Sequence, residues 1–115
     1  MIRPAPRRGE VWLVELDPAR GHEQAGMRPA LVASVDRFNM GPAGLVVVVP
    51  FSSRFKGSPL HVQVEPPEGG LTVRSYLRCE DVRSISVERL VKLLGVVDPA
   101  TLQGAETRLR RLLGL

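Results

Sequence analysis

The stretch LVVVV, Leu45–Val49, decides the fold. Five consecutive aliphatic residues predict a strand that is apolar on both faces and therefore lies in the middle of a sheet. The residues Pro50-Phe51-Ser52-Ser53 end this strand. Hydroxyl groups at that point could donate to a phosphate, although serines that end a strand are also ordinary turn residues.

Other segments around this central strand also favour strands. Alternating or β-favouring residues predict them at Gly9–Leu16, Ala30–Val35, Leu60–Glu65, Leu71–Ile85 (one long or broken strand) and Leu90–Val97. Five or more short strands indicate a small, strongly bent antiparallel sheet or barrel. Residues 1–8, with two prolines and three arginines, are expected to form a flexible basic arm, and residues 9–115 a single domain.

The C-terminal segment changes its period and predicts a helix. Asp98 can cap it, with Pro99 at the first helical position. An apolar stripe then recurs at three- and four-residue steps: Leu102, Ala105, Leu109, Leu112 and Leu113. The expected fold class therefore lies between all-β and α+β.

Size and composition limit the classes of function. A chain of 115 residues supports one modest core, and a domain this small often buries more surface by forming a dimer. The net charge of +4 favours a polyanionic partner. The single cysteine, Cys79, allows no internal disulfide, and no apolar run suits a membrane span or a signal peptide, so we expect a cytoplasmic protein with no membrane partner.

Nothing in the sequence indicates a cofactor or a metal. With two histidines, His22 and His61, and one cysteine there is no zinc set, and the acidic residues lack the spacing of oxygen ligands. Glycine-rich phosphate-binding and dinucleotide-binding patterns are also missing.

Two segments combine residues suited to acid–base chemistry. Between Gly21 and Ala30, a loop carries His22, Glu23 and Arg28 together, which suits chemistry on a charged substrate but is also compatible with a solvated turn. In the strand expected around Cys79, alternation places Arg78 and Glu80 on one face. That pair could act on a phosphate or form an ordinary surface salt bridge, while Cys79 points into the core.

Several segments, in the same order, resemble the signature of the MazF/PemK family of toxin endoribonucleases. They are GEVW (9–12), LDP (16–18), GHEQAG (21–26), RPA (28–30), VPFSS (49–53), KG (56–57), RCE (78–80) and RSI (83–85), the last two being similar to the PemK (Kid) branch. The resemblance implies an SH3-like barrel of the CcdB/PemK type with a terminal helix, acting as a homodimer. It also implies metal-independent cleavage of single-stranded RNA, such as mRNA, and neutralisation by an antitoxin whose disordered tail covers the RNA groove.

The resemblance also implies which residues act. The catalytic arginine, hydroxyl and loop carboxylate match Arg28, Ser52 and Glu23, with His22 beside the last, and the acid–base pair of the PemK-like branch matches Arg78 and Glu80. RNA contacts are expected from Gln24, Ser53, Arg54 and Lys56. The sequence departs from the family at Ser52, where many members have threonine, at Glu80, where they have aspartate, and at Asp81, where glutamine is usual.

In the expected reaction the RNA supplies its own nucleophile, the 2′-hydroxyl. A carboxylate, Glu80 or Glu23, acts as the base, and Arg28 and Arg78 clamp the phosphate because an arginine stays charged. Water or His22 protonates the leaving 5′-oxygen, so the products are a 2′,3′-cyclic phosphate and a 5′-hydroxyl. Two alternatives keep the fold without the reaction: a toxin that poisons DNA gyrase, as CcdB does, or a relic that binds RNA or antitoxin without turnover.

Overall fold

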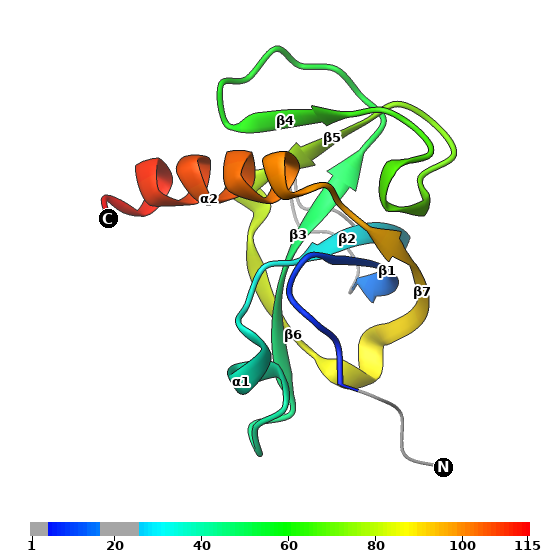
Figure 1. Cartoon of the computed structure of the whole chain (residues 1–115), viewed down its shortest axis with the longest axis vertical. Helices are drawn as coiled ribbons and strands as arrows, with labels where there is room; N and C mark the ends of the chain where they lie inside the picture. Colours follow the sequence, from blue (N-terminus) through cyan, green and yellow to red (C-terminus); the bar gives the residue numbers. More distant parts are fainter. Residues whose placement is uncertain (1–4, 17–25) are drawn as a thin grey trace.

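The computed structural model describes residues 5–16 and 26–115. In this part of the chain seven strands form one antiparallel sheet, accompanied by a short helix, a longer C-terminal helix and three 3-10 turns (Figure 1). The strands are β1 (Glu10–Leu16), β2 (Gly26–Val32), β3 (Leu45–Ser52), β4 (His61–Val64), β5 (Ser75–Arg78), β6 (Arg83–Ser86) and β7 (Leu90–Val96). The helices are α1 (Asp36–Asn39) and α2 (Pro99–Leu113), and the turns are η1 (Glu68–Gly70), η2 (Cys79–Asp81) and η3 (Val87–Arg89).

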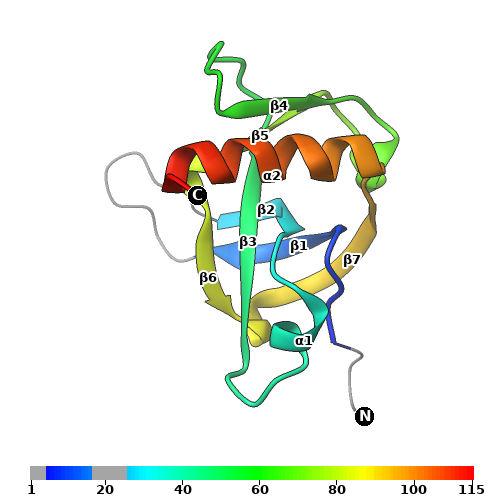
Figure 2. The same ribbon diagram turned by 60° about the vertical axis from the view of Figure 1, so that its left-hand side comes forward.

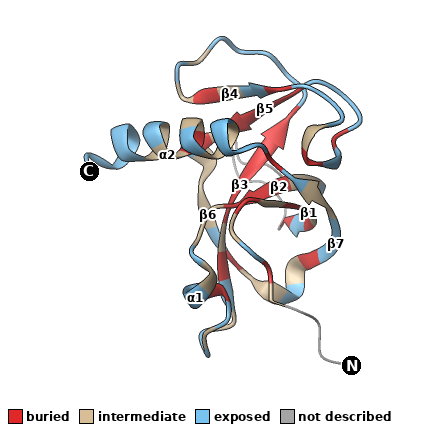
Figure 3. Ribbon diagram, viewed as in Figure 1, coloured by how far each residue is buried: buried red, intermediate tan, exposed pale blue. Residues whose placement is uncertain are grey.

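The strand β3 is the centre of the sheet, as its sequence predicts. It pairs with β2 along one edge and with both β6 and β5 along the other. Val46 and Val48 pack in one core cluster with Trp12, whereas Val49 and Phe51 pack in another, so both faces of β3 are buried (Figure 3).

The segment expected as one long or broken strand, Leu71–Ile85, is broken by the turn η2. Three steps along β3, from Val48 to Phe51, correspond to six along the neighbouring chain, from Arg83 to Leu77. Three residues therefore loop out of the ladder between β5 and β6, and these are the residues of η2. This interruption decides the geometry of the site described below.

The expected strongly bent antiparallel sheet with a C-terminal helix is confirmed, and the sheet is open rather than closed into a barrel. Its strand order runs β4-β5-β3-β2-β1-β7, with β6 beside β3, and no ladder joins β4 to β7 within residues 5–16 and 26–115. The gap is covered by packing instead, because α2 lies against β4 and η2 while η1 lies against β7 (Figure 2). At η1 the contact is backbone to backbone: a Cβ on Gly70 would lie 2.0 Å from the carbonyl oxygen of Leu94.

The C-terminal helix begins as predicted, with Asp98 at its N-cap and Pro99 at its start. Ala105 is buried, and Leu102 and Leu109 pack against the core. The rest of the expected stripe, Leu112 and Leu113, is exposed, because the last turn of the helix extends beyond the sheet (Figure 1). In the described part of the chain no helix is long and apolar enough to cross a membrane.

The described part of the expected arm, residues 5–8, is attached to the domain. Arg8 donates from Nη2 to the carboxylate of Glu106 at 2.6 Å and from Nε to the carbonyl oxygen of Ala33 at 3.0 Å. Asn39 donates to the carbonyl oxygen of Pro6 at 3.1 Å. Arg8 thus joins the N-terminal segment to α2, which a flexible arm would not do.

Candidate active site

Two of the expected site residues lie on neighbouring strands, at the end where their ladder stops. The ladder between β2 and β3 ends with Ala30 opposite Pro50, and Arg28 and Ser52 each lie two residues beyond that pair on their strands. Because side chains alternate along a strand, Arg28 and Ser52 share one face of the sheet. Ser52 is in turn opposite Tyr76 on β5, two residues before Arg78. This face therefore carries a hydroxyl flanked by residues from two neighbouring strands.

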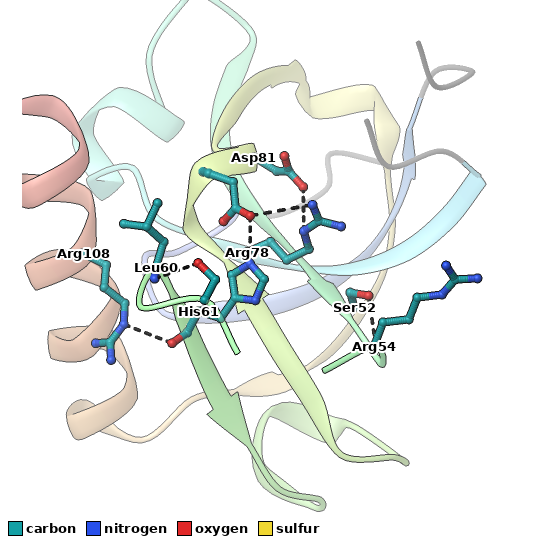
Figure 4. A network of polar contacts seen from close by, with 9 residues as sticks. Ser52, Arg54, Leu60, His61, Arg78, Asp81 and Arg108 are labelled. Carbon is teal, nitrogen blue, oxygen red and sulfur yellow. Dashed lines mark hydrogen bonds and ion pairs between the residues drawn. The ribbon is translucent and has the colours of Figure 1, made fainter. Parts of the chain in front are cut away.

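The turn η2 places two carboxylates around Arg78 (Figure 4). Nη2 of Arg78 lies 3.7 Å from Oε2 of Glu80, and its Nε lies 3.0 Å from Oδ2 of Asp81. The Arg78 side chain is only 12% exposed, so both ion pairs are partly shielded from water. The prediction that Arg78 and Glu80 lie on the same side is confirmed, but its reason is wrong: the strand ends at Arg78, and the 3-10 turn returns Glu80 to it.

A residue that the sequence analysis did not select, His61, completes this cluster. It is a buried residue at the start of β4, directly opposite Arg78 on β5. Its Nε2 lies 2.8 Å from Oε2 of Glu80. Its Nδ1 is buried and has no hydrogen-bond partner among the described residues. The alternation of Leu60–Glu65 indicated a half-buried strand, but nothing in the sequence indicated that its histidine faces Glu80.

The helix α2 holds the backbone of His61 in place. Arg108 donates from Nε to the carbonyl oxygen of His61 at 3.1 Å (Figure 4). Its Nη1 donates to the carbonyl oxygen of Gly104 at 3.0 Å. Arg108 therefore connects the helix to β4. Through this contact α2 supports the strand that carries His61.

The cluster keeps Glu80 ionised. Partial burial alone would raise the pKa of Glu80, but the hydrogen bond from His61, a backbone N–H of the turn and the charge of Arg78 favour the carboxylate. Together they hold the pKa of Glu80 below its ordinary value. The carboxylate is therefore available as a proton acceptor at neutral pH, although each hydrogen bond that lowers its pKa also weakens it as a base.

Cys79, between Arg78 and Glu80, is a core residue. It is fully buried in the cluster that contains Leu77 and Val49. Burial raises the pKa of its thiol to about 11, so it is a neutral thiol at physiological pH. The prediction that Cys79 points into the core is confirmed.

Beside the cluster, the loop that follows β3 presents exposed cations. The hydroxyl of Ser52 accepts the backbone N–H of Arg54 at 3.2 Å, which turns the chain away from the sheet. Ser53, Arg54 and Lys56 are exposed. Neither Arg54 nor Lys56 forms an ion pair with any residue in the described ranges. His22, Glu23 and Gln24 lie outside those ranges.

Where the chain is described, no three His, Cys, Asp or Glu side chains are grouped so as to hold a metal ion. The chemistry that the described residues offer is that of a carboxylate, two arginines and a hydroxyl. These groups can bind a phosphate, stabilise additional charge on it and accept a proton.

Comparisons with known proteins identify the family of this chain. The family model for PemK-like, MazF-like toxins of type II toxin–antitoxin systems matches residues 7–113. Endoribonuclease MazF9 of Mycobacterium tuberculosis is 40% identical over 109 residues, which cover 90% of this chain and 92% of that protein.

Solved structures give the same answer. MazF from Deinococcus radiodurans superimposes with a TM-score of 0.85 at 31% identity, covering 98% of this chain and all of that one. A mycobacterial endoribonuclease solved with its cognate antitoxin has a TM-score of 0.81 at 28% identity and covers 96% of this chain and 97% of its own. The chain therefore belongs to the PemK-like, MazF-like toxins of type II toxin–antitoxin systems, and it is an endoribonuclease toxin of that family.

Proposed function

We propose that this toxin cleaves single-stranded RNA, mRNA included, without a metal ion, at the face formed by Arg28, Ser52, Arg78 and Glu80. The observation that carries the proposal is the shielded cluster at η2, where a carboxylate is held 2.8 Å from His61 and 3.7 Å from Arg78. A surface salt bridge has no need of a buried histidine. A phosphate bound nearby would raise the pKa of Glu80 by repulsion between like charges, and the hydrogen bond from His61 opposes that rise.

The reaction uses the 2′-hydroxyl of the RNA as its nucleophile. A carboxylate removes the proton of that hydroxyl, the 2′-oxygen bonds to phosphorus, and the bond from phosphorus to the 5′-oxygen breaks. Water or His22 supplies a proton to the departing 5′-oxygen. The products are a 2′,3′-cyclic phosphate and a 5′-hydroxyl.

Arg28, Arg78 and Ser52 act on the phosphate itself. A guanidinium binds two phosphoryl oxygens at once and remains charged throughout, so the arginines stabilise the crowded transition state electrostatically. The hydroxyl of Ser52, which already accepts a backbone N–H, can donate its own proton to a phosphoryl oxygen. Glu80 is the base that the described residues support, and Glu23 remains the alternative. His61 touches no substrate in this scheme and serves as a positioning residue for Glu80.

The same proposal covers the partners. It includes a homodimer, neutralisation by a cognate antitoxin whose disordered tail covers the RNA groove, and action in the cytoplasm. Membership of the family supports all three. The mycobacterial relative solved with its antitoxin supports the second of these. Gln24, Ser53, Arg54 and Lys56 contribute RNA contacts outside the reacting phosphate, within one toxin domain of residues 9–115.

One incubation tests the proposal. The purified protein is mixed with a long unstructured RNA in excess EDTA, and the ends of any fragments are identified by mass spectrometry. Discrete fragments with cyclic phosphate ends support it, provided that an Arg28→Ala variant purified in parallel yields none. Retention of RNA without cuts indicates a binding relic, and no interaction with RNA indicates another target such as gyrase. Either result contradicts the proposal.

A further inference from the structure

An aromatic side chain in the loop after β3 is mostly exposed, yet its ring contacts a buried tyrosine. Phe55 is 71% exposed, yet its ring contacts Tyr76 in an edge-to-face arrangement with centroids 5.5 Å apart and an interplanar angle of 61°. The backbone at Gly57, which has a φ of +66°, passes close to the far end of the same ring: a Cβ there would lie 3.5 Å from Cζ of Phe55. The loop turns back on the ring at a position that favours glycine.

Tyr76 is a rigid support for this ring. It is 7% exposed, and its strand pairs on both sides, with Ser52 on β3 and Gln63 on β4. Phe55 therefore rests on a side chain that is itself fixed in the sheet. A large apolar surface that stays in water, while its orientation is set by a buried partner, has the features of a binding platform.

The surroundings of Phe55 favour a nucleic acid over a protein as its ligand. Its chain neighbours Arg54 and Lys56 are exposed cations without ion pairs to described residues. Phe55 is three residues from Ser52, at most about 11 Å along the chain, and Tyr76 joins the two through the sheet. An aromatic ring between two exposed cations, beside the face proposed to bind the phosphate, suits a single-stranded nucleic acid, whose bases stack while its backbone is attracted.

We propose that Phe55, supported by Tyr76, is a stacking platform for the unpaired base of a nucleotide beside the scissile phosphate. The inference rests on the proposed function for the site of cleavage, but it makes a separate claim about binding. Stacking on a ring tolerates every base, so Phe55 contributes affinity and position more than sequence discrimination. The nucleotide that it holds fixes the register of the RNA relative to Ser52.

The test measures binding apart from cleavage. An unstructured, fully 2′-O-methylated RNA cannot react through its 2′-oxygens, so fluorescence anisotropy reports its Kd alone. We expect Phe55→Ala to raise the Kd by about 5- to 150-fold, the range for loss of one stacked base. Phe55→Leu should behave like Phe55→Ala, and Phe55→Trp should restore tight binding. Met40→Ala is the matched control, since Met40 is also 71% exposed but lies at the end of α1.

Abasic substitutions along the same oligonucleotide identify the stacked base. At one position, loss of the base should weaken binding to the wild type by the same factor as Phe55→Ala, with no further loss when both changes are combined. Tight binding by Phe55→Ala, rescue by leucine, or equal sensitivity at every position overturns the proposal. So does a case in which Phe55→Ala changes only self-association, as measured by sedimentation.

The two proposals fail separately in these measurements. If the wild type cleaves RNA and Phe55→Ala binds the oligonucleotide equally well, the platform is wrong and the nuclease stands. If binding depends on Phe55 but the wild type makes no cuts, the platform stands and the proposed function fails.

Discussion

The turn η2 and the loop after β3 both present arginines beside Ser52, but they hold them in opposite ways. In η2, Arg78 is mostly buried and contacts two carboxylates, one of which is held by His61. In the loop, Arg54 and Lys56 are exposed and without ion pairs to described residues. The first arrangement fixes a few groups relative to one another, and the second leaves charge available to whatever approaches.

The difference matches two physical tasks. Stabilising a transition state requires donors and acceptors whose positions are set before the substrate arrives, because reorganisation during the reaction would cost free energy. Attracting a polyanion requires only unpaired charge at the surface, whose effect falls with salt. We therefore expect changes in η2 and its supports to lower the rate of cleavage, and changes in the loop to alter binding.

The largest effect on the rate of RNA cleavage should follow from removing Arg78 beside η2. Arg78→Ala is expected to reduce the single-turnover rate of RNA cleavage by ~10²–10³-fold, the range typical of a lost transition-state donor. Arg54→Ala, which removes the same charge from the loop, should lower the rate at saturating RNA by less than about threefold. Circular dichroism and the melting temperature must show that both variants fold. Equal losses in the two variants would remove the distinction between η2 and the loop.

A smaller effect is expected from loosening the support of Glu80. His61→Leu removes the hydrogen bond that positions Glu80 and should lower kcat by up to about 100-fold, because a misplacement of about 1 Å in a catalytic group can cost that much. His61→Gln retains an N–H donor and should recover part of the loss. These variants also distinguish the two candidate bases.

The acid side of the pH–rate profile shows whether Glu80 or Glu23 is the base. Above the ordinary pKa of 4.5 for a glutamate, the ionised Glu80 stabilises the fold, and this stability is lost as the pH falls through its lowered folded value. In His61→Leu one cause of the lowering is gone while burial remains, so the pKa of Glu80 rises. The acid limb of kcat/KM should then move to higher pH. If the limb stays in place while kcat falls, Glu23 is the better candidate for the base.

Local sequence patterns predicted the elements of this fold better than they predicted its site. The central strand follows from Leu45–Val49, and the start of α2 follows from Asp98-Pro99, because periodicity and capping depend on neighbouring residues. The open sheet and the pair of His61 with Glu80 depend on which strands meet. Which strands meet depends in turn on the three residues that loop out at η2, and the amino-acid composition of a segment does not indicate such a bulge.

Residue chemistry alone marked Arg28, Arg78 and Glu80 as candidates, and the family motifs added the role of each. The alternation of side chains correctly predicted that Glu80 lies beside Arg78, but for a wrong reason, since it assumed a strand that continues through Glu80. Phe55 belongs to no motif or periodic pattern in the sequence, and it is identified only by its exposure and its contact with Tyr76.

The contribution of the loop after β3 to RNA binding should depend on the salt concentration. Each lysine or arginine that neutralises a phosphate of single-stranded RNA contributes about 0.7 to the slope of log K against log salt. Lys56→Ala should reduce that slope by about this amount and weaken binding a few-fold at low salt, with kcat unchanged. Arg37→Ala, an exposed cation on α1, is the control and should leave the slope as it is. A slope that Lys56→Ala does not alter would mean that the loop does not meet the RNA backbone.

The smallest effect is expected inside η2 itself. Cys79 lies between Arg78 and Glu80 but points into the core, and with a pKa of about 11 its thiol is scarcely ionised at pH 8. Iodoacetamide at that pH should leave the native protein unlabelled and active, and should label it only after unfolding. Cys79→Ala should cleave RNA at the wild-type rate and lose about 1 kcal/mol of stability, because the backbone bonds of the turn do not involve the sulfur. Rapid labelling with loss of activity would place the thiol on the reactive face and show that the turn presents a different side to the RNA.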